Sequence, residues 1–589
     1  ACDVAESCNG TADACPQDAF ASSETVCRPS ASICDAPESC SGLSRTCPTD
    51  RARAPGFSCR EGNGTCDPGE TCNGISFECP ANVYTERGVG CSEDPTCDQS
   101  PCACDGVGLC LSACGNGDLD EGEECDDGEL NGQRDRCTME CQAVCGGEPT
   151  WVTGVGGYGP DRVNDLATEL GGRGYAVGTY SPDGEWGFGA WFGESMLSYF
   201  GGNDAFILGH DASGEVQWAS CVGGWDDDLA SGVASDGTGV YMVGSFRSVA
   251  QVACCDDFPT APQLPDEDGC AEIGSWENED SSENMYIARW SDEGDFEWVV
   301  EGGRPWTRER ANGVATDPLG WAFVVGQIDN DGESNNTTMF GNLELDGFGG
   351  YDAFVAGFNR FGVGTMAVVI GGEGYERATS VVLDGGDGVY VLVEAESDFS
   401  FGDSVIEVGS ENELILFALD RQGGYRWHRT INEALDLDGE YFNGGSIAYG
   451  CRLATGSDGQ CGIHVLASTY SDLWVARFDL SGNLDWTADV DSFGEIWAGD
   501  LAVERNGRVT VTGAFSGTAV FGEDELEAEE GGGGSEFFAR APGFEGSGDI
   551  YVARLDAGGE WLWAKRFGSD GRDYGGALGL DDRGAAYVA

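Results

Sequence analysis

The sequence predicts a mainly β protein: a seven-bladed β-propeller preceded by a disulfide-rich, loop-dominated repeat arm. Three observations support this prediction. Twenty-one of the 27 cysteines lie in the first 145 residues, a density typical of secreted modules stapled by disulfides. Glycine is abundant, at 95 residues, and disfavours long helices. From about residue 150, four short hydrophobic segments recur every 59 to 80 residues, as the blades of a propeller require.

The arm begins with an array of 32-residue repeats over residues 1–96. Units this short cannot bury a sufficient core and need covalent staples. Four cysteines per unit could give two bridges each, although spacing leaves the connectivity open. The spacings are wider than those of zinc sites, so disulfides are favoured. The twelve cysteines of the array are Cys2, Cys8, Cys15, Cys27, Cys34, Cys40, Cys47, Cys59, Cys66, Cys72, Cys79 and Cys91.

These repeats resemble the disintegrin-like module. The stretch Cys34-Asp35-Ala36-Pro37-Glu38-Ser39-Cys40-Ser41-Gly42, preceded by Cys27-Arg28 and followed by Cys47-Pro48, fits its motif. Tandem copies of this kind resemble secreted proteins of myxobacteria-like bacteria. In the animal module the integrin-binding loop lies between the cysteines that match Cys27 and Cys34. Here that loop is Arg28-Pro29-Ser30-Ala31-Ser32-Ile33 and lacks Arg-Gly-Asp, so the arm is interpreted as a stiff spacer.

A second cysteine-rich, acidic module is expected over residues 97–149. Its pattern of Cys-Gly-Asn-Gly followed by a Glu- and Asp-rich turn resembles another repeat of secreted bacterial proteins. Hard carboxylate oxygens suit calcium, so Glu124, Asp126 and Asp127 are candidate ligands. An acidic, solvated turn is the alternative interpretation.

Residues 150–589 are expected to form the propeller, of about seven blades with the last incomplete. Each unit has two hairpin strands, such as residues 380–384 and 388–393, then a Phe-Gly segment and an Asp-Ala-Phe strand. A fourth strand carries Trp218, Trp298, Trp427, Trp486 or Trp563, with Met366 in one copy. These side chains are expected to pack between blades. Together the motifs resemble bacterial SBBP-type β-propeller repeats.

The ring is expected to close through both ends of this segment. Six complete sets of strands run from about residue 163 to 563, a Trp strand at 151–157 precedes them, and a hairpin at 577–589 follows. A seventh blade built from both ends would remove a sheet edge. It would lack its Asp-Ala-Phe strand, so either the polypeptide continues or a neighbouring molecule donates a strand. A six-bladed ring with spare strands is the remaining alternative.

The charge and the remaining motifs limit the possible functions. A net charge of −74 disfavours nucleic acid and anionic membranes as partners, and no apolar run is long enough to span a membrane. Only three histidines occur, His210, His428 and His464, and no phosphate-binding or nucleophile motif is found. The chain is therefore interpreted as a non-enzyme, although a paired-carboxylate glycosidase stays open.

Calcium is the one cofactor expected, and no organic cofactor is. Two turns place oxygen ligands on alternate residues, Asp329 with Asp331 and Asp436 with Asp438. An acidic residue also recurs after the glycines that end the fourth strand. These residues are Asp161, Asp228, Glu309, Glu376 and Asp573. Ordinary turn carboxylates are the alternative. One further disulfide is expected, between Cys451 and Cys461.

Together these patterns predict an extracellular or cell-surface structural or adhesion protein, with a propeller head on a disulfide-stapled stalk. Its expected partners are other copies of itself, surface proteins or glycans. One alternative is a subunit of an extracellular filament, assembled by strand donation or by contacts between stalk and propeller. The second is a propeller that binds glycans or acts on polysaccharides.

Overall fold

The computed structural model of the chain divides into two compact units, Ala1–Glu148 and Pro149–Ala589, here called the N-terminal and C-terminal units. The residues that the structure describes are 1–7, 10, 16–62, 65–85, 102–104, 110–112, 150–157, 159–169, 171–181, 189–253, 270–274, 282–330, 337–401, 404–408, 413–435, 444–452, 460–504, 506–528, 548–568, 573–581 and 584–589. Among them, no helix has the length and apolar character needed to cross a membrane. The division of the N-terminal unit at residue 96 stays a prediction.

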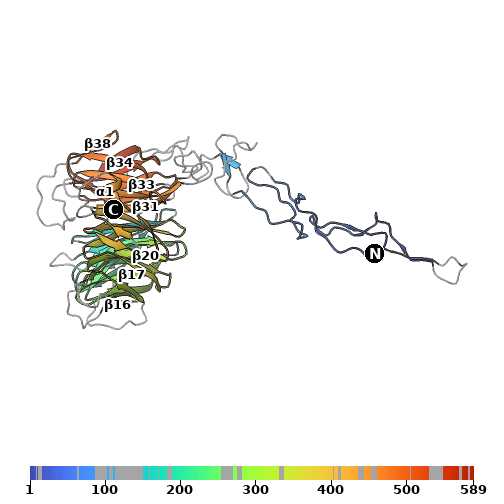
Figure 1. The fold of residues 1–589 in the computed structure, drawn as a ribbon, viewed down its shortest axis with the longest axis horizontal. Helices are drawn as coiled ribbons and strands as arrows, with labels where there is room; N and C mark the ends of the chain where they lie inside the picture. Colours follow the sequence, from blue (N-terminus) through green and yellow to red (C-terminus); the bar gives the residue numbers. More distant parts are fainter. Residues whose placement is uncertain are drawn as a thin grey trace. The chain divides into compact units, whose positions relative to one another are not determined.

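The described part of the N-terminal unit consists of short two-stranded ladders joined by loops (Figure 1). β1 (Asp3–Val4) pairs with β2 (Ala19–Phe20), β3 (Val26–Arg28) with β4 (Glu38–Ser39), and β5 (Cys102–Cys104) with β6 (Cys110–Ser112). The first two pairings recur 32 residues later as single bridges, Asp35 with Ala52 and Ser58 with Thr71. The repeat seen in the sequence is therefore a repeat of backbone structure.

The disulfides of the array join successive repeats. Cys2 bonds Cys40 and Cys34 bonds Cys72, each across 38 residues, and Cys27–Cys47 and Cys59–Cys79 each span 20 residues. None of these four bridges closes within a repeat, which answers for these eight cysteines the connectivity that the spacing left open. Each described junction instead carries two bridges. Cys66 is also disulfide-bonded, whereas Cys8, Cys15 and Cys91 lie outside the described residues.

A buried glutamate tightens each junction. Glu38 is 6% exposed, pairs with Arg28 at 3.0 Å, and accepts a hydrogen bond from the Arg51 backbone N–H at 2.9 Å. Thirty-two residues on, Glu70 pairs with Arg60 at 3.1 Å and accepts the Val83 N–H at 2.9 Å. The recurring arginine, glutamate and cysteines thus hold each pair of successive repeats together.

Antiparallel sheets make up the C-terminal unit, and Figure 1 shows them following one another in chain order, from the green strands to the orange ones. In each complete sheet the four main strands pair in sequence order. The first two sheets contain β7 (Arg162–Thr168), β8 (Gly174–Tyr180), β11 (Asp204–His210) and β12 (Val216–Gly224), then β13 (Leu229–Ser235), β14 (Gly239–Arg247), β17 (Glu283–Ser291) and β18 (Phe296–Gly303).

Four further sheets continue this order. The third and fourth contain β19 (Arg310–Thr316), β20 (Ala322–Asn330), β23 (Gly350–Phe358) and β24 (Gly364–Ile370), then β25 (Glu376–Leu383), β26 (Gly388–Ala395), β29 (Glu413–Asp420) and β30 (Tyr425–Thr430). The fifth and sixth contain β31 (Gly444–Arg452), β32 (Gln460–Ser468), β33 (Asp472–Asp479) and β34 (Leu484–Ser492), then β35 (Ile496–Val503), β36 (Val509–Phe515), β39 (Asp549–Leu555) and β40 (Trp561–Phe567). A short helix, α1 (Ile431–Ala434), and a final hairpin of β41 (Leu578–Leu580) and β42 (Ala586–Val588) complete the unit.

The Phe-Gly segments form hairpins that link neighbouring sheets. Each follows the second main strand of its sheet, and three of them pair with the fourth strand of the preceding sheet. The hairpins are β9 (Ala190–Phe192) with β10 (Ser195–Leu197), β15 (Val249–Val252) with β16 (Ala271–Gly274), β21 (Thr337–Phe340) with β22 (Leu343–Asp346), β27 (Phe399–Phe401) with β28 (Ser404–Ile406), and β37 (Thr518–Phe521) with β38 (Asp524–Glu527). Successive sheets are therefore joined by backbone hydrogen bonds.

Four tryptophans of the fourth strands pack between sheets, as the sequence predicts, whereas Trp563 lies against the Arg554 guanidinium of its own sheet, 5.3 Å away. The ring of Trp218 covers Gly294, in the turn between the third and fourth strands of the next sheet, and its indole N–H donates to the Asp292 carbonyl at 3.2 Å. A positive φ of 92° and the lack of a Cβ fit glycine to this place. The same contact recurs at Trp151–Gly214, Trp298–Gly362, Met366–Gly423, Trp427–Gly482 and Trp486–Gly559.

The first strands of the sheets contact one another in a cyclic order. β7 contacts β13, and the series continues through β19, β25, β31, β35 and β41 back to β7. At the junction of the two ends, the Thr168 hydroxyl donates to the Leu580 carbonyl at 2.7 Å, and the rings of Trp151 and Tyr587 lie 5.7 Å apart. The hydrophobic core accordingly lies in layers between successive sheets, such as Val177 and Ile207 against Met242.

One expected strand is not formed. Residues 151–157 make only an isolated bridge, between Gly156 and Trp191. In the complete sheets the tryptophan strand pairs with an Asp-Ala-Phe strand. Each such strand in the described residues already pairs with its own tryptophan strand, so residues 151–157 have no ladder partner there.

Candidate functional site

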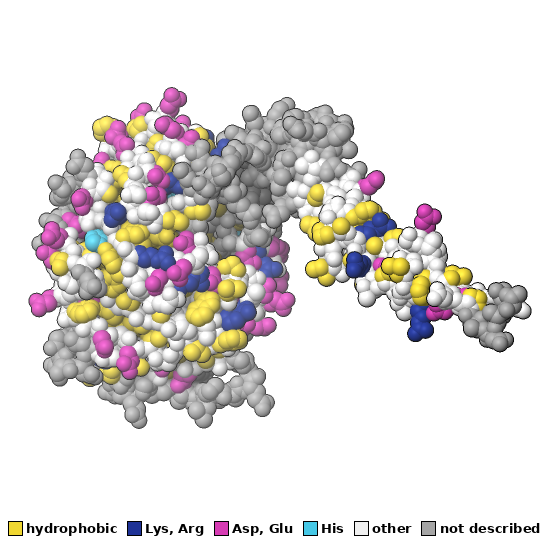
Figure 2. All heavy atoms as spheres, turned by 45° about the vertical axis from the view of Figure 1, so that its right-hand side comes forward, with side chains coloured by type: hydrophobic (Ala, Val, Ile, Leu, Met, Phe, Trp, Pro, Cys, Tyr) yellow, Lys and Arg dark blue, Asp and Glu magenta, His cyan; other side chains and the backbone are white. Residues whose placement is uncertain are grey.

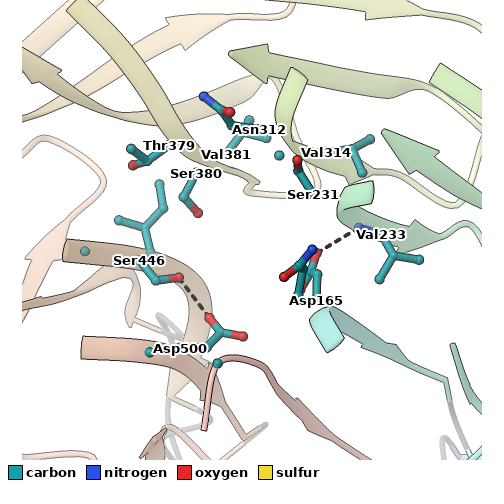
Figure 3. A pocket seen from close by; sticks show the side chains of 16 residues that line it. Asp165, Ser231, Val233, Asn312, Val314, Thr379, Ser380, Val381, Ser446 and Asp500 are labelled. Carbon is teal, nitrogen blue, oxygen red and sulfur yellow. Dashed lines mark hydrogen bonds between the residues drawn. The ribbon is translucent and has the colours of Figure 1, made fainter. Parts of the chain in front are cut away.

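A cavity of about 290 Å³ lies where the first strands of six sheets converge, beside Gly576 ahead of β41 (Figure 3). Small polar side chains and glycines line most of it. Figure 3 shows Asp165 of β7 and Asp500 of β35 at its edge, with Ser231, Ser380 and Ser446 on other strands. None of the described residues that line it is aromatic.

Bulges in the first strands bring these side chains together. The pairing of first and second strands shifts register at Asn164, Asn312 and Thr379, among others. A bulge re-aims a side chain, and the Asn164 amide donates to the Ala230 carbonyl of the next sheet at 2.7 Å. Asn312 repeats this bond to the Ala378 carbonyl at 2.9 Å. Side-chain hydrogen bonds at the cavity wall thus connect each of these sheets to the next.

Both carboxylates at the cavity accept hydrogen bonds from neighbouring strands. Asp165 accepts the Val233 N–H at 2.7 Å. Asp500 accepts the Ser446 hydroxyl at 2.8 Å and the Leu578 N–H at 3.0 Å, and so connects three first strands. Each also accepts the N–H of the residue after it, at 2.8 Å.

The electrostatics fit a structural role for this pair. Desolvation, reinforced by the negative charge of Asp500, raises the pKa of Asp165 to about 8, and burial also raises the pKa of Asp500. Two perturbed carboxyls in a cavity are a pattern seen in acid–base catalysis. Here their oxygens are engaged by backbone N–H groups and by the Ser446 hydroxyl, and the described residues of the wall offer no aromatic surface for a sugar. The geometry therefore favours a structural role, in which the two carboxyl groups hold neighbouring first strands together by hydrogen bonds.

The predicted calcium ligands are not assembled by the described residues. Glu124, Asp126, Asp127, Asp331, Asp436 and Asp438 all lie outside them. Asp329 stands near the end of β20, where its carbonyl accepts a hydrogen bond from Arg304 at 3.2 Å. These sites stay predictions. For the expected bridge in the head, Cys461 is disulfide-bonded and faces Cys451 in the ladder of β31 and β32.

A different acidic group in the arm was missed by the sequence interpretation. Oxygens of Asp35, Glu38 and Asp50 lie within 4.8 Å of one another. One oxygen of Asp35 is buried without a hydrogen-bond partner, which suits a hard cation. Arg28 already pairs with Glu38 at 3.0 Å and with Asp50 at 3.1 Å. A calcium ion here would share these carboxylates with a guanidinium. The signal was the 32-residue recurrence of the aspartate and glutamate.

The three histidines occupy separate places. His210 lies on β11, where its Nδ1 is 2.9 Å from the Asp211 carbonyl. His428 on β30 contacts the Tyr425 hydroxyl at 2.8 Å, and burial lowers its pKa. Burial lowers the pKa of His464, on β32, to about 3. The rings of His210 and His464 also lie near aromatic rings of other segments, Tyr587 at 5.8 Å and Trp486 at 5.8 Å, so the three histidines do not form one site among the described residues.

Exposed aromatic side chains recur at one end of the sheets. Trp225, Trp306 and Phe493 all lie on connections from a fourth strand to the next first strand, and are 68%, 75% and 79% exposed. Large apolar groups in water are a mark of interaction sites when they gather. Acidic side chains, in contrast, are spread over the visible face of the unit, with Lys and Arg between them (Figure 2).

No model of a known protein family matches this chain, and a search of curated proteins finds no significant relative.

Proposed function

We propose that the C-terminal unit is a seven-bladed β-propeller of the SBBP-like kind, carried by an arm of disintegrin-like repeats in a secreted bacterial protein. Three features support the propeller. The complete sheets are four-stranded meanders, their first strands contact one another in a closed cycle, and Trp151 and Tyr587 meet where the ends join. A ring of this kind removes exposed sheet edges.

The function that the geometry supports best is adhesion at the cell surface or in the extracellular matrix. The observation that carries it is the recurrence of Trp225, Trp306 and Phe493 at equivalent connections, exposed on the rim of a rigid scaffold. Aromatic side chains anchor protein and glycan contacts at a low cost in conformational entropy. The engaged carboxylates of the central cavity support a role without catalysis.

The test is binding by the full chain to a glycan array and to a surface that carries the same protein. The triple variant Trp225→Ala, Trp306→Ala, Phe493→Ala should lose at least tenfold in affinity for whatever the wild type retains. Leu319→Ala with Phe361→Ala is the matched control, because these residues are 72% and 75% exposed in turns at the opposite ends of strands. Equal loss in both variants, or binding to neither surface, would contradict the proposal.

The arm fits the role of a covalently interlocked spacer. Two disulfides cross each described junction between repeats, so tension passes through covalent bonds rather than through a small core. Assembly into a filament is the alternative, and sedimentation velocity over a hundredfold concentration range separates the two. Growth of the particle with concentration would favour the filament, whereas a constant monomer would favour a monomeric adhesin.

A further inference from the structure

Acidic side chains from two successive sheets meet in pairs beside the glycines that end the fourth strands. Asp204 begins β11, Asp228 directly precedes β13 of the next sheet, and both are 0% exposed. The Gly224 backbone N–H faces both carboxylates. Each also accepts one backbone N–H of its own, from Phe200 at 3.0 Å and from Arg247 at 3.3 Å.

Apart from the shared Gly224 N–H, which faces both groups, each carboxylate of this pair has one oxygen that no donor of its own satisfies. Asp204 Oδ1 and Asp228 Oδ2 are fully buried and have no hydrogen-bond partner. Desolvation raises the pKa of Asp204 to about 7, and desolvation with the charge of Asp204 raises that of Asp228 well above its usual range. A buried acceptor without a donor is costly, and two such acceptors of like charge are costlier still.

The arrangement recurs two sheets further on. Asp352 is the first buried residue of β23, and Glu376 is the first residue of β25 in the next sheet. Both are 0% exposed. A Cβ added to Gly371 would lie under 3.0 Å from an oxygen of each, so the two carboxylates converge on a place that only glycine leaves open. Glu376 Oε1 is buried without a partner, and its other oxygen accepts the Gly372 N–H at 2.8 Å.

A third copy shows what compensation by a protein group looks like. Asp549 of β39 and Asp573 converge in the same way on Gly568. There Arg566 pairs with Asp549 at 2.7 Å and brings a positive charge to the junction. For Asp204, Asp228 and Glu376 no ion pair is found among the described residues.

We propose that Asp204 with Asp228, and Asp352 with Glu376, each hold a calcium ion between two successive sheets. Carboxylate oxygens are the donors that calcium prefers, and a divalent cation neutralises both charges and satisfies the unpartnered oxygens. Carbonyl and water oxygens would complete its shell. The ion would fix the connections that carry Trp225 and, through the strand start at Glu376, the third junction of the ring.

The test is calcium binding by the full chain after chelation, measured by titration calorimetry and native mass spectrometry with calcium chloride in 0.5 M sodium chloride. The salt screens diffuse binding to exposed acidic groups. The wild type should bind calcium tightly, and Asp228→Asn and Glu376→Gln should each bind one calcium ion fewer than the wild type. Asp226→Asn is the matched control. It removes the same charge from an exposed side chain that lies two residues before Asp228, and it should bind as many ions as the wild type.

Thermal unfolding of the wild type tests the proposal even when a variant fails to fold. Calcium should raise the melting temperature of the chelated wild type and of Asp226→Asn by similar amounts. Unchanged stoichiometry in Asp228→Asn would overturn the proposal. So would a wild-type melting temperature that responds to pH but not to calcium, since this is the behaviour of carboxyl pairs that share a proton.

Discussion

At the scale of single residues, the carboxylate of Asp500 matters most in the cavity wall, because it accepts bonds from the strands on either side of its own. Replacing it with alanine leaves the Ser446 hydroxyl and the Leu578 N–H without this acceptor. Each unsatisfied buried donor costs on the order of 1–3 kcal/mol. We expect Asp500→Ala to lower the free energy of unfolding by about 2–4 kcal/mol, as measured by denaturant titration.

Two comparison variants make this prediction specific. Asp500→Asn retains one acceptor oxygen and should lose less than the alanine variant. Asp387→Ala removes an exposed carboxylate that pairs with Arg426 on the surface, where ion pairs contribute at most about 1 kcal/mol. If Asp387→Ala destabilised the protein as much as Asp500→Ala, the bonds between strands would not be the cause.

Glycines of the second strands make a related prediction. A Cβ on Gly326 would lie under 3.0 Å from the Arg310 backbone carbonyl and from the Phe354 ring. Because the backbone cannot give way cheaply, Gly326→Ala should lower the free energy of unfolding by roughly 2–3 kcal/mol. Gly154→Ala, with nothing within 4 Å of its Cβ, should change it by less than about 0.5 kcal/mol. Similar melting temperatures for both variants would contradict the packing argument.

Residue patterns predicted packing better than they predicted sites. Four of the five tryptophans, and Met366 in one copy, were expected between sheets and are found there, since their period reports the fold directly. Only one member of each carboxylate pair was recognised from the sequence. Asp228 and Glu376 recur after glycines, but their partners Asp204 and Asp352 come from other strands. Only pairing across sheets reveals such neighbours. Asp165 and Asp500 were hidden for the same reason.

At the scale of elements, the disulfides that cross between repeats determine how the arm responds to damage. Removing Cys34–Cys72 by the double change Cys34→Ser, Cys72→Ser opens a crosslink that spans 38 residues. Loop-closure entropy assigns such a crosslink about 4 kcal/mol. We expect protease cleavage around Cys59–Cys79 to become at least tenfold faster, while the C-terminal unit, a separate compact body, keeps its melting temperature.

The comparison variant removes the shorter bridge. Cys27→Ser with Cys47→Ser opens a crosslink of 20 residues at the preceding junction and should expose that junction instead. Cleavage at the same positions in both variants would mean that the repeats unfold together. The spacing of cysteines alone could not decide between bridges within and across repeats, because both satisfy the same period.

At the scale of the whole molecule, the number of buried carboxyls reverses the usual dependence of stability on pH. Burial raises the pKa of Asp165 and Glu309 to about 8 and that of Asp204 and Glu376 to about 7. The native protein therefore holds protons that the unfolded chain releases above about pH 4. Stability contributed by these groups is complete below that pH and is lost as the pH rises through 7 to 8.

With calcium removed by chelation, we therefore expect the melting temperature to fall steadily from pH 5 to pH 8. Each such carboxyl contributes a slope of up to about 1.4 kcal/mol per pH unit. Repulsion within a chain of net charge −74 acts in the same direction, but 1 M salt screens exposed charges and leaves buried groups largely unscreened. The fall should therefore persist in 1 M salt and become shallower in Asp165→Asn. A melting temperature that rises between pH 5 and pH 8 under these conditions would contradict this prediction. It would show that the buried carboxyl groups are ionised, not protonated, in the native protein.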